Sequence, residues 1–157
     1  MEQPMPTYLL DTCIFNWVKD GKIDLEELPK DGLLAVTSVQ LFEIDRCTEP
    51  RRTELRAALN ELAPEHNAPM RSLRADISRA DVDLVGLSLH PDSVYERVKF
   101  LLIQKDPKPG KLASHELDAE IASSAAAVDA RLLTCDANLH AAMMEAGLES
   151  RLLRNRP

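Results

Sequence analysis

Four acidic residues occupy positions from which their carboxylates could act together on a metal ion. Two of them, Asp11 and Asp136, come just after short apolar runs, and the other two, Glu43 and Asp118, lie within segments of helical character. Carboxylate oxygens without an accompanying His or Cys cluster are ligands that suit hard cations such as Mg²⁺ or Mn²⁺. A divalent cation held in this way can activate water and stabilise the transition state of phosphodiester hydrolysis. We therefore take these four residues as the candidate metal ligands and catalytic residues.

Each acid taken alone also has an ordinary structural explanation. A carboxylate that follows a strand, as Asp11 and Asp136 do, often caps the next helix. Glu43, within an amphipathic helix, is typical of a surface residue, and Asp118, in the first turn of a helix, favours the helix dipole. A site is indicated only if the four converge, because clustered carboxylates repel each other unless a cation neutralises them.

Short apolar runs alternate with helical patterns along the chain. The predicted strands cover 8–10, 33–36, 82–89 and 131–134, with an edge strand near 152–153. The predicted helices cover 13–18, a segment capped by Ser38 that carries Glu43, 51–62, 70–79, 92–104, a segment from Ser114 to about 128, and one from 137 to about 147. This alternation predicts an α/β fold, a three-layer α/β/α sandwich with a mostly parallel central sheet. In such sheets ligands bind beyond the carboxyl ends of the strands, which is where the acids would meet.

The size and charge of the chain limit the classes to which it can belong. Its 157 residues suit a single domain over 1–157. No apolar run approaches the ~20 residues that span a bilayer, and residues 1–7 lack the pattern of a secretory signal, so we expect a cytoplasmic protein without membrane contact. A net charge of −7 is unusual for a nucleic-acid binder. A carboxylate site contributes to that charge, however, and its metal reverses the local sign.

Other kinds of active site find little support in the sequence. With five glycines and no Walker or dinucleotide pattern, a phosphate-binding loop is not indicated. The three cysteines, Cys13, Cys47 and Cys135, form no CxxC pair and are expected to be reduced, partly buried thiols. The four histidines fall in no catalytic context, so a Ser/His/Asp triad is not indicated either.

The four acids and their neighbours together resemble the PIN-domain ribonuclease family. Tyr8–Phe15 resembles its opening motif, in which a strand ends in an acid, and Thr37–Ile44 resembles its second motif. Leu117–Ala122 resembles the third and Leu133–Asn138 the fourth. The order and the local context agree from residue 8 to about 147. Within that family the pattern is most similar to the VapC-type toxins of bacterial toxin–antitoxin pairs.

The resemblance implies a metal-dependent endoribonuclease that cleaves single-stranded or looped RNA and leaves a 5′-phosphate and a 3′-hydroxyl. It implies Mg²⁺ or Mn²⁺ as the cofactor. Thr12 and Thr134 would orient the carboxylates through their hydroxyls. Glu43 would bind the metal directly or through water, and the residues that would hold it directly are Asp11, Asp118 and Asp136.

The resemblance also implies partners. A toxin of this kind binds a cognate antitoxin, whose C-terminal segment enters the acidic site. The amphipathic helix over 51–62, whose apolar stripe includes Leu55 and Leu59, is expected to form the groove for it together with the neighbouring helix. Because homodimers are common in the family, a homodimer is a further expected assembly.

The sequence departs from the pattern in two places and leaves alternatives open. The stretch between Glu43 and Asp118 is longer than expected for a compact toxin, and Asn138 stands where many relatives have a second acid. One alternative is a PIN nuclease that acts in RNA processing without an antitoxin, and another is a non-catalytic PIN-fold interaction module. A phosphatase of the haloacid-dehalogenase type would need an acid two positions after Asp11, where this chain has Cys13.

Overall fold

The computed structural model describes residues 5–62 and 94–154. In chain order, its strands, helices and 3-10 turns are β1 (Thr7–Leu10), α1 (Thr12–Lys19), η1 (Leu25–Glu27), β2 (Leu33–Ala35), α2 (Ser38–Asp45), α3 (Arg51–Leu62), α5 (Val94–Lys105), η2 (Pro109–Lys111), α6 (Leu112–Ala127), β3 (Arg131–Thr134), α7 (Ala137–Glu145) and β4 (Ser150–Leu152). The predicted helix over 70–79 and the predicted strand over 82–89 lie outside the described residues.

The four described strands form one parallel sheet in the order β2-β1-β3-β4. Leu9 of β1 pairs with Ala35 of β2 on one side and with Leu132 of β3 on the other. β4 is the edge strand predicted near 152–153. The prediction of an α/β fold with a mostly parallel central sheet is therefore confirmed.

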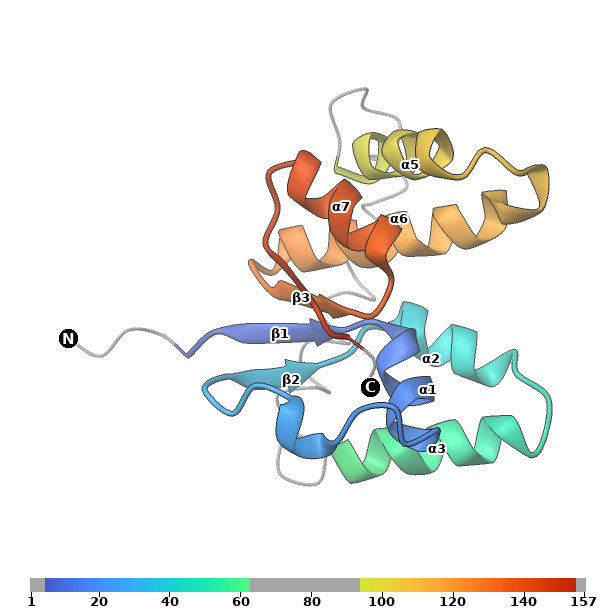
Figure 1. Ribbon diagram of the computed structural model, residues 1–157, viewed down its shortest axis with the longest axis vertical. Coiled ribbons are helices and arrows are strands. Elements are labelled where there is room, and N and C mark those ends of the chain that lie inside the picture. The colour runs from blue at the N-terminus through green and yellow to red at the C-terminus, as the bar shows by residue number, and fades with distance from the viewer. Residues whose placement is uncertain (1–4, 63–93, 155–157) are drawn as a thin grey trace.

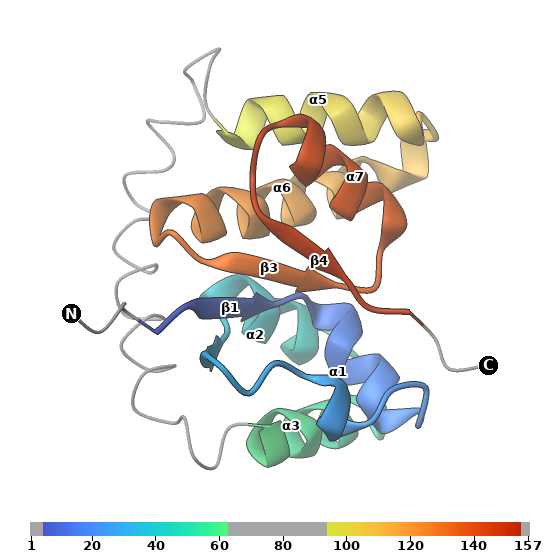
Figure 2. The same ribbon diagram turned by 60° about the vertical axis from the view of Figure 1, so that its left-hand side comes forward.

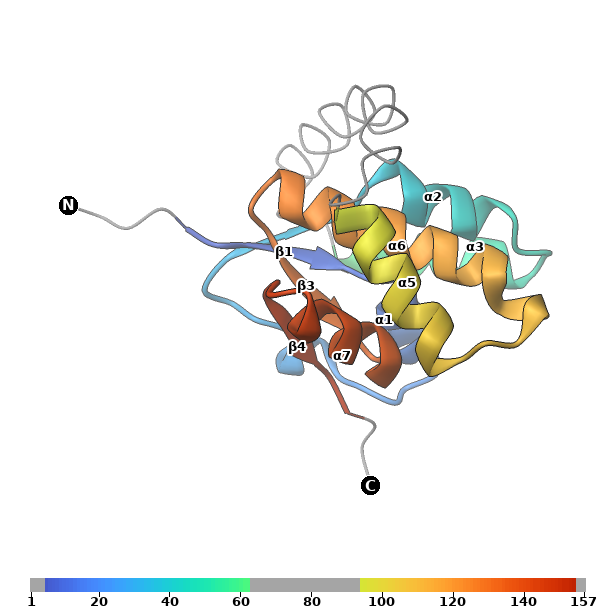
Figure 3. The ribbon, with the colours of Figure 1, turned by 90° about the horizontal axis from the view of Figure 1, so that it is seen from above.

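Helices cover both faces of this sheet and so make the three layers. Figure 1 shows α5, α6 and α7 in the upper half of the molecule and α1, α2 and α3 in the lower half. The turned view in Figure 2 shows β1 and β3 side by side between these two groups. The chain steps from β1 to β2 in one direction across the sheet and from β3 to β4 in the other, so right-handed crossovers place α1 and α7 on opposite faces. Seen from above, α5 lies over α6 (Figure 3). No helix in residues 5–62 and 94–154 is both long and apolar enough to cross a membrane.

Burial of the central strands explains this layering. Leu9, Leu10, Leu132 and Leu133 have no exposed surface. A strand that is buried on both faces appears in the sequence as a continuous apolar run, which is why 8–10 and 131–134 could be recognised as strands. On α6, fully buried alanines and serines keep the side chains short where the helix packs against β3.

The start of α2 is fixed to the end of β1 by one buried side chain. Gln40 donates from Nε2 to the carbonyl oxygen of Leu10 at 2.7 Å, and its Oε1 accepts from the backbone N–H of Thr37 at 2.9 Å. Thr37 is the N-cap of α2 and forms a capping box with Gln40, so the expectation that Ser38 caps this helix is wrong. The link holds Glu43, three residues further along α2, in a set position relative to β1.

α6 begins earlier than the sequence suggests. The helix expected after Ser114 starts at Leu112, directly after the 3-10 turn η2. Asp118 therefore lies in the second turn of α6 and not in the first. Its ordinary explanation, a favourable charge at the start of a helix, no longer applies, because that effect is confined to the first turn.

The apolar stripe of α3 faces the core of this chain. Leu55 is 1% exposed, and Leu59 is partly buried against the same core. α3 packs against α1 and α2. Leu55 is therefore not available to a partner, and the expectation that it lines an antitoxin groove is wrong.

Candidate metal centre

The ends of β1 and β3 bring Asp11 and Asp136 to the same edge of the sheet. Leu10 pairs with Leu133, so the residues that follow these strands leave the sheet side by side. Thr134 links the two acids: its Oγ1 donates to Oδ2 of Asp11 at 2.7 Å and accepts from the backbone N–H of Asp136 at 3.0 Å. In Figure 1 the arrowheads of β1 and β3 point to the side where α2 and the start of α6 lie.

Asp11 is buried, with 5% of its surface exposed. Its Oδ1 accepts from the backbone N–H of Thr12 at 2.8 Å, so it does cap α1. Its Oδ2 accepts from Thr134 and from the thiol of Cys13, whose sulfur is 3.3 Å away. Burial raises the pKa of Asp11 above its usual value and the charge of Asp136 adds to the rise, while these three hydrogen bonds oppose it.

Glu43 reaches the same place from α2. Oγ1 of Thr12, the residue after Asp11, donates to Oε1 of Glu43 at 3.1 Å. Burial raises the pKa of Glu43 to about 7, with further contributions from the charges of Asp11 and Glu120. An ordinary surface glutamate would not be perturbed in this way, so the surface explanation of Glu43 does not hold.

The pKa of Asp118 is raised further above its usual value than that of Glu43. Burial raises the pKa of Asp118 to about 9, and the charges of the other three acids, Asp11, Asp136 and Glu43, add to the rise. Within the described residues no donor makes a hydrogen bond to its carboxylate. A largely buried carboxylate without a donor is unstable as an anion unless a cation lies beside it.

Asp136 has two roles in this arrangement. Its Oδ1 accepts from the backbone N–H groups of Asn138 and Leu139, at 2.9 and 3.2 Å, and so caps α7. Its charge also raises the pKa of Asp11 and that of Asp118. The capping explanation is therefore correct for Asp11 and Asp136, but it does not account for the repulsion among the acids.

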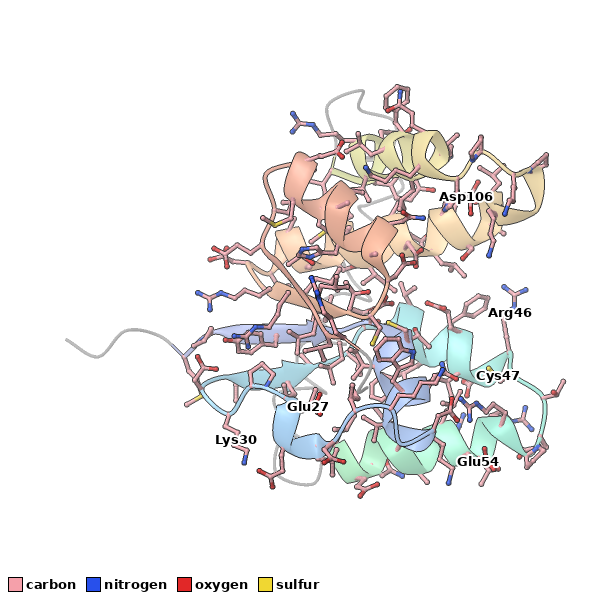
Figure 4. The ribbon with its side chains drawn as sticks, in the orientation of Figure 1. Glu27, Lys30, Arg46, Cys47, Glu54 and Asp106 are labelled. Carbon is pink, nitrogen blue, oxygen red and sulfur yellow. The ribbon has the colours of Figure 1, made fainter. Side chains whose placement is uncertain are left out.

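Two basic side chains stand at the margin of these acids. Lys111 lowers the pKa of Asp118, and Arg46 lowers that of Glu43, but in each case burial and the neighbouring acids outweigh the cation. Figure 4 shows Arg46 after α2 and Asp106 after α5, both on the side to which the strands point. The guanidinium of Arg46 lies over the exposed ring of Phe42, 5.4 Å from its centroid.

The donor set fits a hard divalent cation. All four acids present carboxylate oxygens, and each of the two that cap a helix keeps a second oxygen that makes no bond to that helix. In the described part of the chain, no three His, Cys, Asp or Glu side chains lie close enough together to hold a metal ion as they stand. Like charges hold carboxylates apart, and a divalent cation would remove that repulsion.

Glu120 is a further acid near this cluster. It lies two residues after Asp118, on another face of α6, and its side chain is exposed. Its charge nevertheless raises the pKa of Glu43. The short separation from Asp118 in the sequence could have indicated this effect. The interaction between two charges depends on their distance, whichever way the side chain points.

Replacing Thr134 with valine is expected to weaken metal binding. The change removes the donor to Asp11 and leaves the backbone N–H of Asp136 without its acceptor. Loss of a group that orients a ligand typically costs about 10- to 100-fold in metal affinity. The unpaired N–H should lower the free energy of unfolding by about 1–3 kcal/mol. Titration of the protein with Mn²⁺ by calorimetry and unfolding in urea measure the two effects.

Thr134→Ser is the matched control because it keeps the hydroxyl and loses a methyl group. We expect it to bind Mn²⁺ much as the unmodified protein does. If the serine and valine variants lost the same affinity, the hydroxyl would have no part in holding Asp11.

No model of a protein family matches this chain, and no curated protein matches it. Among solved structures, it is similar to the crystal structure of VapBC2 from Rickettsia felis bound to a DNA fragment from their promoter. The two share 18% identity over 96% of this chain and 99% of that chain, with a TM-score of 0.48.

Proposed function

We propose that this chain is a divalent-metal-dependent endoribonuclease, and that it is the toxin of a toxin–antitoxin pair. The observation that carries the nuclease proposal is the convergence of four carboxylates from four segments at one edge of the sheet. Burial and mutual repulsion raise the pKa values of Asp11, Glu43 and Asp118. Carboxylates whose pKa values are perturbed by burial and by one another cluster at functional sites.

Asp11, Asp118 and Asp136 would hold the metal, and Glu43 would be a further ligand. A bound Mg²⁺ or Mn²⁺ would supply an activated water and neutralise the charge that develops on the scissile phosphate. The residues around the acids fix their geometry. Thr134 holds Asp11, and Thr12 donates to Glu43.

The rest of the site supports an anionic substrate. Lys111 and Arg46 lie close enough to Asp118 and Glu43 to affect their protonation, so a phosphate that approached the acids would meet both cations. An exposed aromatic ring, Phe42, lies beside Arg46. The choice of RNA and the toxin assignment rest on the four sequence motifs.

Cleavage of a mixed cellular RNA pool tests the proposal. The protein is incubated with the pool in Mg²⁺, in Mn²⁺ and in EDTA, and Asp11→Asn is assayed beside it. We expect cutting that needs the metal, that disappears in Asp11→Asn and that leaves a 5′-phosphate on each new fragment. The sequences at the fragment ends then identify the target.

Asp129→Asn is the matched control for the loss of a carboxylate. Asp129 is exposed at the far end of α6, and its φ of 54° is one that asparagine adopts readily. It should cut RNA as the unmodified protein does. Cleavage that persisted in EDTA, or that Asp11→Asn retained in full, would contradict the metal site, whereas the absence of any cutting would favour the interaction module.

A further inference from the structure

Two cysteines meet beside the acids. Cys13 lies in the first turn of α1, and Cys135 lies between β3 and α7, so each follows one of the two paired central strands. The sulfur of Cys13 accepts a hydrogen bond from the backbone N–H of Cys135 at 3.0 Å. The Cys135 side chain and burial also raise the pKa of the Cys13 thiol.

This hydrogen bond brings the backbone of one cysteine to the sulfur of the other, and a disulfide needs such proximity. A disulfide requires two cysteines whose α-carbons are about 4.4–6.8 Å apart and whose side chains point to each other. Here the backbone of Cys135 touches the sulfur of Cys13, and the parallel pairing of Leu10 with Leu133 sets the distance between the two chain segments. Both cysteines are partly exposed, so a small reagent can reach them.

The same thiol supports the metal ligand Asp11. Cys13 donates from its sulfur to Oδ2 of Asp11 at 3.3 Å, and Oγ1 of Thr134, which donates to the same Oδ2, lies 3.6 Å from that sulfur. The third cysteine, Cys47, is separate from this pair: its thiol donates to the backbone carbonyl of Glu43, and Figure 4 shows it at the end of α2 beside Arg46. Cys13 and Cys135 therefore form a pair of neighbouring thiols, and Cys47 serves as a control thiol without such a neighbour among the three cysteines.

We propose that Cys13 and Cys135 are an oxidisable pair that a low-molecular-weight disulfide, such as oxidised glutathione, converts to an intramolecular disulfide, and that this bridge weakens the metal centre. The bridge itself depends only on the two cysteines. Its effect on the metal rests on the proposed function.

The reaction proceeds in two balanced exchanges. The sulfur of Cys135 attacks the reagent, which forms a mixed disulfide and releases one molecule of the reduced thiol with the proton of Cys135. The sulfur of Cys13 then attacks Cys135, the mixed disulfide breaks, and the second reduced thiol leaves with the proton of Cys13. Two cysteine thiols are oxidised, and one molecule of the reagent is reduced to two thiols.

The bridge changes the surroundings of Asp11. Once its sulfur is bonded to that of Cys135, Cys13 has no S–H to donate to Oδ2 of Asp11. The bond also ties the segment after Asp11 to the segment before Asp136, so the two carboxylates lose freedom to close around an ion. Loss of such supporting contacts typically weakens metal binding by about 10- to 100-fold.

Trypsin separates the three cysteines, which makes the bridge directly measurable. Cys13 falls in the peptide 1–19, Cys47 in 47–51 and Cys135 in 132–151. The folded protein is treated with oxidised glutathione, alkylated, digested and analysed by mass spectrometry. We expect 1–19 joined to 132–151 with the loss of two hydrogens, and alkylated Cys47. A lasting glutathione adduct, a bridge to Cys47, a bridge between two chains or three free thiols would each overturn the proposal.

The effect on the metal is measured by titrating reduced and oxidised protein with Mn²⁺. We expect oxidation to lower the affinity about 10- to 100-fold and dithiothreitol to restore it. Cys135→Ser should be insensitive to the oxidant, and Cys47→Ser should respond as the unmodified chain does. An oxidised protein that bound Mn²⁺ as well as the reduced one would overturn the regulatory effect. A reduced protein that bound none would overturn the proposed function, while the mass measurement would still decide the bridge.

Discussion

Replacing Asp118 with asparagine is expected to change activity and stability in opposite directions. RNA cleavage should fall by about 100-fold or more, because loss of a ligand costs more than loss of a group that only orients one. Without metal, the same variant should be more stable than the unmodified protein at pH 8. Burial and three neighbouring acids raise the pKa of Asp118 to about 9, so folding at pH 8 requires this carboxyl to take up a proton or to remain a buried anion.

Asparagine at position 118 needs no proton uptake and buries no charge, and its amide can donate a hydrogen bond to a neighbouring carboxylate. We expect a gain of at least about 2 kcal/mol in the free energy of unfolding, or a Tm higher by roughly 4–8 °C. Thermal unfolding in EDTA measures it. Asp129→Asn should leave both activity and Tm unchanged, because that carboxylate is exposed and distant. A lower Tm for Asp118→Asn at pH 8 would mean that the acids do not repel one another in the folded protein.

The metal-free protein is expected to lose stability as the pH rises from about 5 to about 9. The folded pKa values of Glu43 and Asp118, about 7 and about 9, both exceed their usual values. Between the usual and the folded value the native state binds more protons than the unfolded state, so the free energy of unfolding falls with increasing pH. The two protonated carboxyls contribute fully to the free energy of unfolding below about pH 4. The contribution of Glu43 is lost as the pH rises past about 7, and that of Asp118 as it rises past about 9.

Mg²⁺ should counteract this loss, because a metal binds deprotonated carboxylates and its stabilising effect grows as they ionise. Melting curves in EDTA and in Mg²⁺ at pH 5, 6, 7 and 8 test both statements. We expect the two curves of Tm against pH to diverge with increasing pH. Asp118→Asn should show a flatter dependence in EDTA. A metal-free Tm that rose between pH 5 and pH 8 would contradict the charge repulsion at this site.

The central strands and the acids that follow them could be predicted because their signals are local. Leu9 and Leu132 belong to continuous apolar runs, and each run leads directly to a carboxylate. The start of α6 was missed because Ser114 is a common cap, whereas the turn at Pro109 leads straight into the helix. For α2, Thr37 and Gln40 have the sequence pattern of a capping box. Serine is an equally good N-cap when residues are considered one at a time, so Ser38 was chosen instead.

The parts that could not be predicted depend on long-range contacts. The apolar stripe containing Leu55 was recognised, but its partner was not, because periodicity identifies a buried face without saying what buries it. The bonds from Gln40 to Leu10 and from Thr134 to Asp11 join residues far apart in sequence. The contact between Cys13 and Cys135 is of the same kind.

The bond between Thr134 and Asp11 spans 123 positions of the chain. Contacts between such distant residues form late in folding. The chain must first lose the conformational entropy of closing a very long loop, and only then does the contact stabilise the fold. On the ribosome, Asp11 emerges long before β3, and until β3 has been synthesised it has neither Thr134 nor Asp136 beside it. A nascent or truncated chain that ends before β3 thus lacks the assembled acidic cluster, and the cell that makes this protein meets a complete site only once β3 and Asp136 have been synthesised.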